Sequence, residues 1–222
     1  MALSAALTML AATDERPVPF VKIVRIAGSV EIQRTTEGDP VAAKLGDKLF
    51  AGEVLQVKKG GKVQLCFPPN TLVLLKENSV LALSELTPER RTATFLTAGQ
   101  MIANLQEALS PGSSFEVETP TALAIVRGTV FEIEIDEPVK EGEMPTVRFY
   151  GHRGQVDIMF AEEVLQLEPG SLIQLAPDGI PQLLTHSRKL EEILEMFDPE
   201  YWEEELKKEA EKEIRKRLPK FG

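Results

Sequence analysis

Two runs of alternating apolar and polar residues between Ser114 and Asp136 constrain the fold of this chain most strongly. Phe115 and Val117 share one face of the first run. The second run has an apolar set opposed by an acidic set, namely Val130, Phe131, Ile133 and Ile135 against Glu132, Glu134 and Asp136. A period of two is the signature of half-buried strands, so we expect two β-strands here.

The middle of this segment contains two residues with strong backbone preferences. Pro120 cannot donate a main-chain hydrogen bond, so the first strand should end there or lie at an edge. Gly128 stands between Arg127 and Thr129, where a bulge or a close approach of two backbones would fit a residue without a side chain.

The same style of short strand and tight turn runs through most of the chain. Gly28, Gly99 and Gly154 each stand between two expected strands, at separations too unequal for a strict repeat. We therefore predict an all-β fold of antiparallel stacked hairpins, in the form of a sandwich, a roll or a solenoid-like stack. The clearest expected strands cover 20–26, 30–34, 54–58, 63–67, 92–96, 100–105, 146–150 and 155–160.

The central segment also carries a recognisable motif. Its hallmark residues are Thr119, Pro120, Arg127, Gly128, Thr129 and Phe131. This pattern resembles the hallmark of the FecR domain family, and the similarity extends from about Val21 to Ala176. We expect these motif residues to have mainly structural roles.

The resemblance implies an exported, all-β, non-enzymatic module. The founding members of the family are iron-uptake regulators that span the inner membrane and pass a periplasmic signal to a sigma factor. The sequence shows neither their cytoplasmic anti-sigma region nor a full transmembrane helix, and no evident domain of the secretin or TonB type. We therefore carry over the fold and the binding-module character rather than sigma-factor regulation.

Charge and composition exclude several kinds of site. The net charge of −10, without a basic stripe, argues against nonspecific nucleic-acid binding. Cys66 is the only cysteine, so no intrachain disulfide forms, and its strand-like surroundings favour a buried, inert thiol. His152 and His186 are too few and too scattered to indicate a metal site, and we expect no cofactor.

The first residues resemble part of an export signal. The segment 2–12 is small and apolar, with a cleavage-like region at its end, but no Lys or Arg precedes it. It is too short to span a bilayer. We interpret residues 1–19 as a signal-peptide remnant and linker, with the true start upstream or trimmed; a packed N-terminal turn is the alternative. We expect a β domain over 20–184, a helical extension over 185–222, and a periplasmic or otherwise exported location.

The C-terminal segment changes to helical spacing. Apolar residues at such spacing precede Asp198, which with Pro199 forms a helix-start signal. Four residues then recur four apart, namely Trp202, Leu206, Ala210 and Ile214. This stripe predicts either a solvated helix with a narrow apolar edge against the β domain, or a docking helix for a partner or a second copy. We therefore take these four residues as candidate partner-binding residues, through which the chain could also form a homo-oligomer.

No catalytic motif is evident. The pairs Glu116 with Glu118 and Glu132 with Glu134 could flank a glycosidic bond, but a solvated strand face explains them better. Arg127 could bind an anion, although we expect it to satisfy backbone carbonyls or an acidic neighbour. We predict a noncatalytic cell-envelope module that binds a protein partner in signalling or envelope assembly. The alternative is a carbohydrate- or cell-wall-binding module, which would usually display more aromatic residues.

Overall fold

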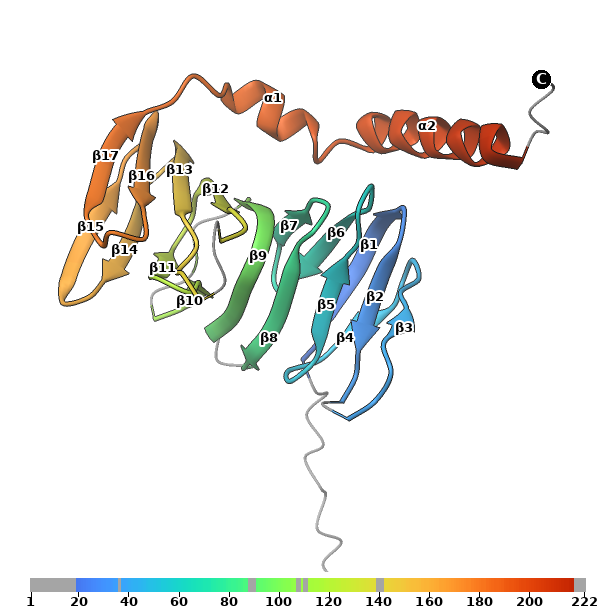
Figure 1. Ribbon diagram of the computed structural model, residues 1–222, viewed down its shortest axis with the longest axis horizontal. Helices are drawn as coiled ribbons and strands as arrows, with labels where there is room; N and C mark the ends of the chain where they lie inside the picture. Colours follow the sequence, from blue (N-terminus) through green and yellow to red (C-terminus); the bar gives the residue numbers. More distant parts are fainter. Residues whose placement is uncertain are drawn as a thin grey trace, which may run out of the picture.

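The computed structural model describes residues 19–35, 37–87, 91–106, 109, 112–138 and 142–217. Within these residues the chain is mostly β, with two helices at its C-terminal end, as predicted (Figure 1). The expected signal segment lies outside them. In the part of the chain that is described, no helix is long and apolar enough to cross a membrane.

The strands follow one another closely along the sequence. In chain order they are Val21–Ala27 (β1), Val30–Gln33 (β2), Val41–Ala42 (β3), Lys48–Leu49 (β4), Val54–Val57 (β5), Lys62–Phe67 (β6), Thr71–Leu75 (β7), Val80–Leu86 (β8), Arg91–Leu105 (β9), Ser114–Glu118 (β10), Leu123–Val126 (β11), Val130–Ile135 (β12), Val147–Arg153 (β13), Val156–Phe160 (β14), Glu163–Leu167 (β15), Ser171–Leu175 (β16) and Pro181–Thr185 (β17). The helices are Leu190–Glu195 (α1) and Pro199–Arg217 (α2).

These strands form one continuous sheet that is folded into two facing layers. The first layer has the order β4-β1-β6-β7-β9-β12-β13-β16-β17. The second has the order β3-β2-β5-β8-β9-β10-β11-β14-β15. The long strand β9 belongs to both layers, and β9 with β10 is the parallel pair in this otherwise antiparallel set of described strands. The fold is thus a sandwich of hairpins stacked side by side.

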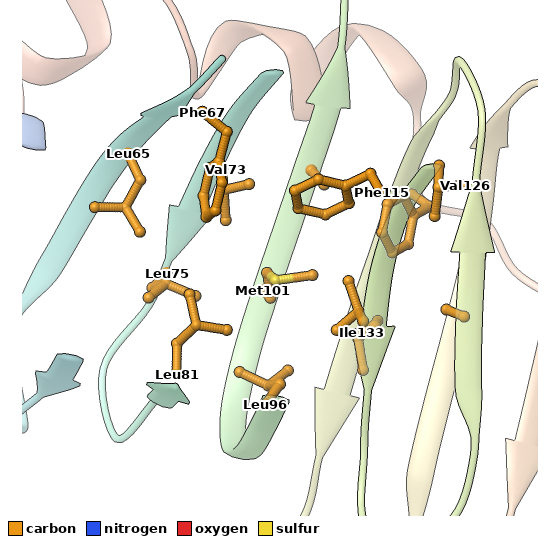
Figure 2. Close-up of a cluster of buried hydrophobic side chains, with 14 of the residues drawn as sticks. Leu65, Phe67, Val73, Leu75, Leu81, Leu96, Met101, Phe115, Val126 and Ile133 are labelled. Atoms are coloured by element: carbon orange, nitrogen blue, oxygen red, sulfur yellow. The ribbon is translucent and has the colours of Figure 1, made fainter. Parts of the chain in front are cut away.

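The main hydrophobic core lies between the two layers. Figure 2 shows side chains of both layers meeting there, and Phe67 of the first layer contacts Phe115 of the second edge-to-face, with ring centroids 5.3 Å apart. Phe131 and Ile133 are fully buried on this inner side, as their alternation predicts. Removal of this apolar surface from water is the main driving force for the fold.

The chain crosses between layers at the glycines that the sequence singled out. Gly99 does not separate two strands as expected; it is the bend at which β9 passes from the second layer to the first. Its φ of +84° and its position, where a Cβ would lie 2.4 Å from Ser79 Oγ, require glycine. Gly154 has a φ of +71° and faces the neighbouring crossing at Thr129 in the same way.

The two helices pack on the outer side of the first layer (Figure 1). Three side chains of the tail are buried there, namely Ile193 of α1, Phe197 between the helices and Trp202 of α2. They pack against apolar residues of the sheet, namely Ala27, Leu74, Ile102 and Val130. α2 begins at Pro199, where the sequence predicts a helix start. Trp202 Nε1 donates to the carbonyl oxygen of Met196 at 3.0 Å, which holds the corner between the helices.

Candidate functional site

Glu132 is the centre of a buried polar cluster where the C-terminal tail meets the sheet. It lies on the outer face of β12 with none of its surface exposed. The Gln100 amide and the Arg188 guanidinium donate to its Oε1, and His152 Nε2 lies 3.3 Å from its Oε2. The prediction of a solvated strand face is therefore wrong for Glu132, because the tail segment before α1 covers that face.

Arg188 attaches the tail to the sheet. It lies between β17 and α1, and its second amino group donates to Glu134 Oε2 at 2.9 Å. Its guanidinium lies 3.8 Å from the centre of the Tyr150 ring, and Tyr150 itself donates its hydroxyl to Glu134 at 3.0 Å. One side chain of the tail thus engages two carboxylates and an aromatic face of β12 and β13.

The electrostatics of this cluster favour a charged carboxylate at its centre. Burial raises the pKa of Glu132, but hydrogen bonds from His152 and Arg188 outweigh it, and the net pKa lies below the usual value. Burial lowers the pKa of nearby Lys76, although the Glu132 charge acts in the opposite direction. Burial, together with Glu134, raises the pKa of Tyr150 to about 12.

The fold brings together two histidines that lie far apart in the sequence. The rings of His152 and His186 meet edge-to-face with centroids 5.0 Å apart. His186 Nε2 lies 2.9 Å from the Gly151 carbonyl oxygen, and its Nδ1 accepts from the Arg188 main-chain N–H at 3.2 Å. Sequence spacing could not reveal this pair, since the four strands β14 to β17 separate the two residues along the chain.

The predicted partner-binding stripe of α2 divides into a buried and an exposed part. Trp202 is only 2% exposed and packs against the chain's own sheet, so it does not present itself to a partner. Leu206 is 49% exposed and Ala210 is also exposed. Ile214 lies in α2, but its side chain is outside the described residues. The first turns of the helix are further anchored by an ion pair between Lys62 and Glu205.

The family-motif residues build a hairpin and a crossing between layers. β10 ends at Glu118, before Pro120, as predicted. The Thr119 hydroxyl donates to the Ala122 carbonyl oxygen at 2.9 Å and accepts from the Ala122 N–H at 3.0 Å, which closes the β10–β11 turn. Gly128 and the buried Thr129 then lead into β12, where Phe131 enters the core.

Arg127 forms a hydrogen bond through its main chain. Its main-chain carbonyl accepts from Leu109 N at 2.8 Å, but its side chain is exposed. Within the described ranges no hydrogen bond or ion pair of the guanidinium is seen, and the expectation that it satisfies carbonyls or an acidic neighbour stays a prediction.

A hollow of about 460 Å³ lies on the outer face of the second layer beside the β10–β11 turn. Arg91 and Glu116 form an ion pair at its border, with Arg91 Nη2 2.9 Å from Glu116 Oε2. The hydrogen bond from Arg91 lowers the pKa of Glu116, while Glu118 is exposed. The acidic pair on β10 therefore consists of one paired and one solvated carboxylate.

Cys66 is less buried than predicted. It lies on the outer face of β6 and is half-exposed. Burial nevertheless raises the pKa of its thiol, which disfavours the reactive thiolate at neutral pH.

Comparison with known proteins identifies the β region. Residues 53–144 match the FecR protein family. The similarity to FecR proteins is therefore shown for this part of the chain. This match includes every motif residue from Thr119 to Phe131, so the resemblance that the sequence suggested is confirmed.

Solved structures show the same fold. Two crystal structures from Parabacteroides distasonis ATCC 8503, each provisionally described as an anti-sigma factor, are similar to this chain. The first has 21% identity and a TM-score of 0.52, with 60% of each chain covered. The second has 19% identity and a TM-score of 0.53, with 66% of this chain and 64% of the other covered. The chain thus spans less than two thirds of either of those proteins. No curated protein shows significant sequence similarity to it.

Proposed function

We propose that this FecR-domain protein is a noncatalytic regulatory module in signalling, which binds a protein partner in the cell envelope through its C-terminal helix. The proposal rests on the way in which the C-terminal tail, the segment after β17 that includes α1 and α2, is attached to the sheet. Arg188 and Trp202 fix it to the outer face of the first layer, and α2 then continues past β1 with Leu206 and Ala210 in solvent (Figure 1). A helix that is anchored at one end and exposes apolar residues along one side is suited to bind in a hydrophobic groove of another protein.

Two further observations support this proposal. FecR proteins and the solved anti-sigma structures are associated with signalling, which fits a regulatory rather than a catalytic role. Among the described residues, Trp202 and Tyr150 are both buried, so neither offers an exposed ring on which a sugar could stack. This disfavours the cell-wall-binding alternative, for which stacked aromatics would be expected.

The test compares full-length variants in the native host. Removal of the whole tail would uncover Glu132 and the apolar cluster beneath α1, so surface substitutions are cleaner. The tagged protein is crosslinked in intact cells, the envelope is fractionated, and copurifying proteins are identified for the wild type, for Leu206→Lys with Ala210→Lys, and for Val41→Lys on the distant strand β3 as matched control.

The proposal predicts an envelope protein that copurifies with the wild type and the control and is lost with the helix variant. Retention of that protein by the helix variant would place the contact on the β domain instead. Recovery from the cytoplasm alone, or retention on purified cell wall without a protein partner, would contradict the proposal.

A further inference from the structure

The edge strands of the first and second layers differ in length between the two ends of the sandwich. At the β3 and β4 end, each edge strand has only two residues, and Leu49 is fully buried. Short edge strands are a common protection against pairing with other chains. At the opposite end, the first layer ends at β17 and the second at β15, away from both helices (Figure 1). Here β17 forms a five-residue edge.

The β17 edge is apolar and uncharged. Leu183 is 71% exposed and Leu184 44% exposed, and no charged residue occurs in the segment 180–185. Charges that would normally protect an edge are thus missing, and Pro181 protects only its first position. In a chain of net charge −10, a neutral edge of this length is a place where two copies can approach without strong repulsion.

Leu183 points toward the inside of the sandwich although it is exposed. It pairs with Ile173, which in turn pairs with Phe149, and both of these residues are buried in the main core. Side chains directly opposite one another on neighbouring strands lie on the same face of the sheet, so Leu183 lies on the same inner face as Ile173 and Phe149. It is exposed because no described strand of the second layer extends beyond β15 to cover it.

We propose that two copies of this chain associate through antiparallel pairing of their β17 strands around a two-fold axis at Leu183. We take the partner of this edge to be a second copy of the chain. An antiparallel strand pair with a two-fold axis at one residue is self-complementary, and in it the uncharged segment of one copy faces the same uncharged segment of the other. The pairing makes the first layer continuous across both copies. It also sets the two Leu183 side chains against each other on the core side, where each shields the other from water.

The main-chain groups of β17 fit this register. His186 donates its N–H to the Gly170 carbonyl oxygen at 3.1 Å, toward β16. Because the direction alternates along a strand, residues 182 and 184 also face β16, and Leu183 and Thr185 face outward. Each Leu183 would then donate to Leu183 of the second copy. Each Thr185 N–H would reach the carbonyl oxygen of Pro181 in the second copy, so the missing proline N–H disturbs only the outermost pair.

The test measures the mass of the full chain in solution by light scattering and sedimentation from about 1 to 300 µM, a range that detects micromolar dimers. The wild type should approach twice its chain mass of 24.6 kDa. Leu183→Lys opposes two like charges at the axis and should weaken the dimer by about tenfold or more. Val41→Lys, on the opposite edge, should leave it unchanged. Because Leu183 is exposed, circular dichroism and Trp202 fluorescence should show that the variant is folded.

The two-fold register allows a sharper test. A mixture of Leu183→Lys with Leu183→Glu should form a heterodimer at concentrations at which each variant alone is mainly monomeric. A wild type that stays monomeric over the whole range would overturn the proposal, as would a dimer that is insensitive to Leu183→Lys. Failure of the mixture to restore association would refute the register. None of these outcomes depends on the envelope partner proposed for α2.

Discussion

Substitution of Arg188 by alanine should release the tail more than any other single change outside the apolar cluster. Glu132 would keep its contacts with Gln100 and His152 but lose the Arg188 guanidinium, and the tail segment before α1 would still cover it. Breaking a buried ion pair costs about 3–5 kcal/mol because a buried charge is left uncompensated. The Arg188 side chain is 34% exposed, so water can enter after its removal, and we expect the lower end, about 3 kcal/mol.

The assay follows two signals during urea denaturation. Trp202 is the only tryptophan and lies in the tail interface, so its fluorescence reports docking, while far-UV circular dichroism reports the strands. A loss of about 3 kcal/mol lowers the melting temperature of a chain of this size by about 6–12 °C if unfolding remains two-state. If the tail opens first, the fluorescence transition should precede the dichroism transition.

A double-mutant cycle decides whether the effect comes from the ion pair. Glu132→Gln removes the charge, and the Arg188→Ala, Glu132→Gln double variant should be less destabilised than the sum of the single variants by about 2 kcal/mol. Arg91→Ala, which breaks the exposed pair with Glu116, is the control and should cost less than about 1 kcal/mol. Additivity of the two substitutions within about 0.5 kcal/mol would refute the coupling, and so would an Arg188→Ala protein as stable as the wild type.

Three further predictions test other parts of the account. Because the pKa of Glu132 in the folded protein lies below its ordinary 4.5, the unfolded chain binds more protons in acid. The free energy of unfolding should therefore fall as the pH drops below about 4.5, and its dependence on pH should be shallower in Glu132→Gln. Equal pH dependences in urea titrations of the two proteins would contradict this. Trp202→Ala should cost about 3–4 kcal/mol and expose α2 to trypsin, whereas Leu206→Ala should change stability by less than about 0.5 kcal/mol. Gly154→Ala should lower the urea midpoint more than Gly170→Ala, with a difference in stability of about 1–2 kcal/mol. Both glycines have positive φ, but only at Gly154 would an added Cβ lie against a neighbouring crossing, 2.8 Å from Thr129 Cγ2. Equal midpoints would disprove that contact.

The alternation of apolar residues predicted much of the fold. The inner faces of β10 and β12 follow directly from Phe115, Val117 and Ile133, and Pro120 marks the end of β10. The helical spacing after Ser187 likewise predicted α1 and α2. These features depend on local periodicity, which a sequence records directly.

The candidate site could be predicted only in part, because it depends on distant contacts. Glu132 reads as a solvated strand residue until the tail, more than fifty positions later, is placed over it by Arg188. No pattern in the sequence indicates that contact, since a single arginine before a helix is common. Trp202 shows the same limit: its position in a four-residue stripe predicted an apolar helix edge, but not which members of that edge would be buried by the sheet.

The most direct test of the account is amide hydrogen exchange, followed by mass spectrometry, on the full-length native protein. The tail is docked on the outer face of the first layer. We therefore expect α1 and the first turns of α2 to exchange slowly, together with β12. Arg188→Ala should accelerate exchange in all three elements while β5 and β8 remain protected. Rapid exchange of α1 and α2 in the wild type, with the strands of both layers protected, would show that the tail is not docked and would contradict the central claim.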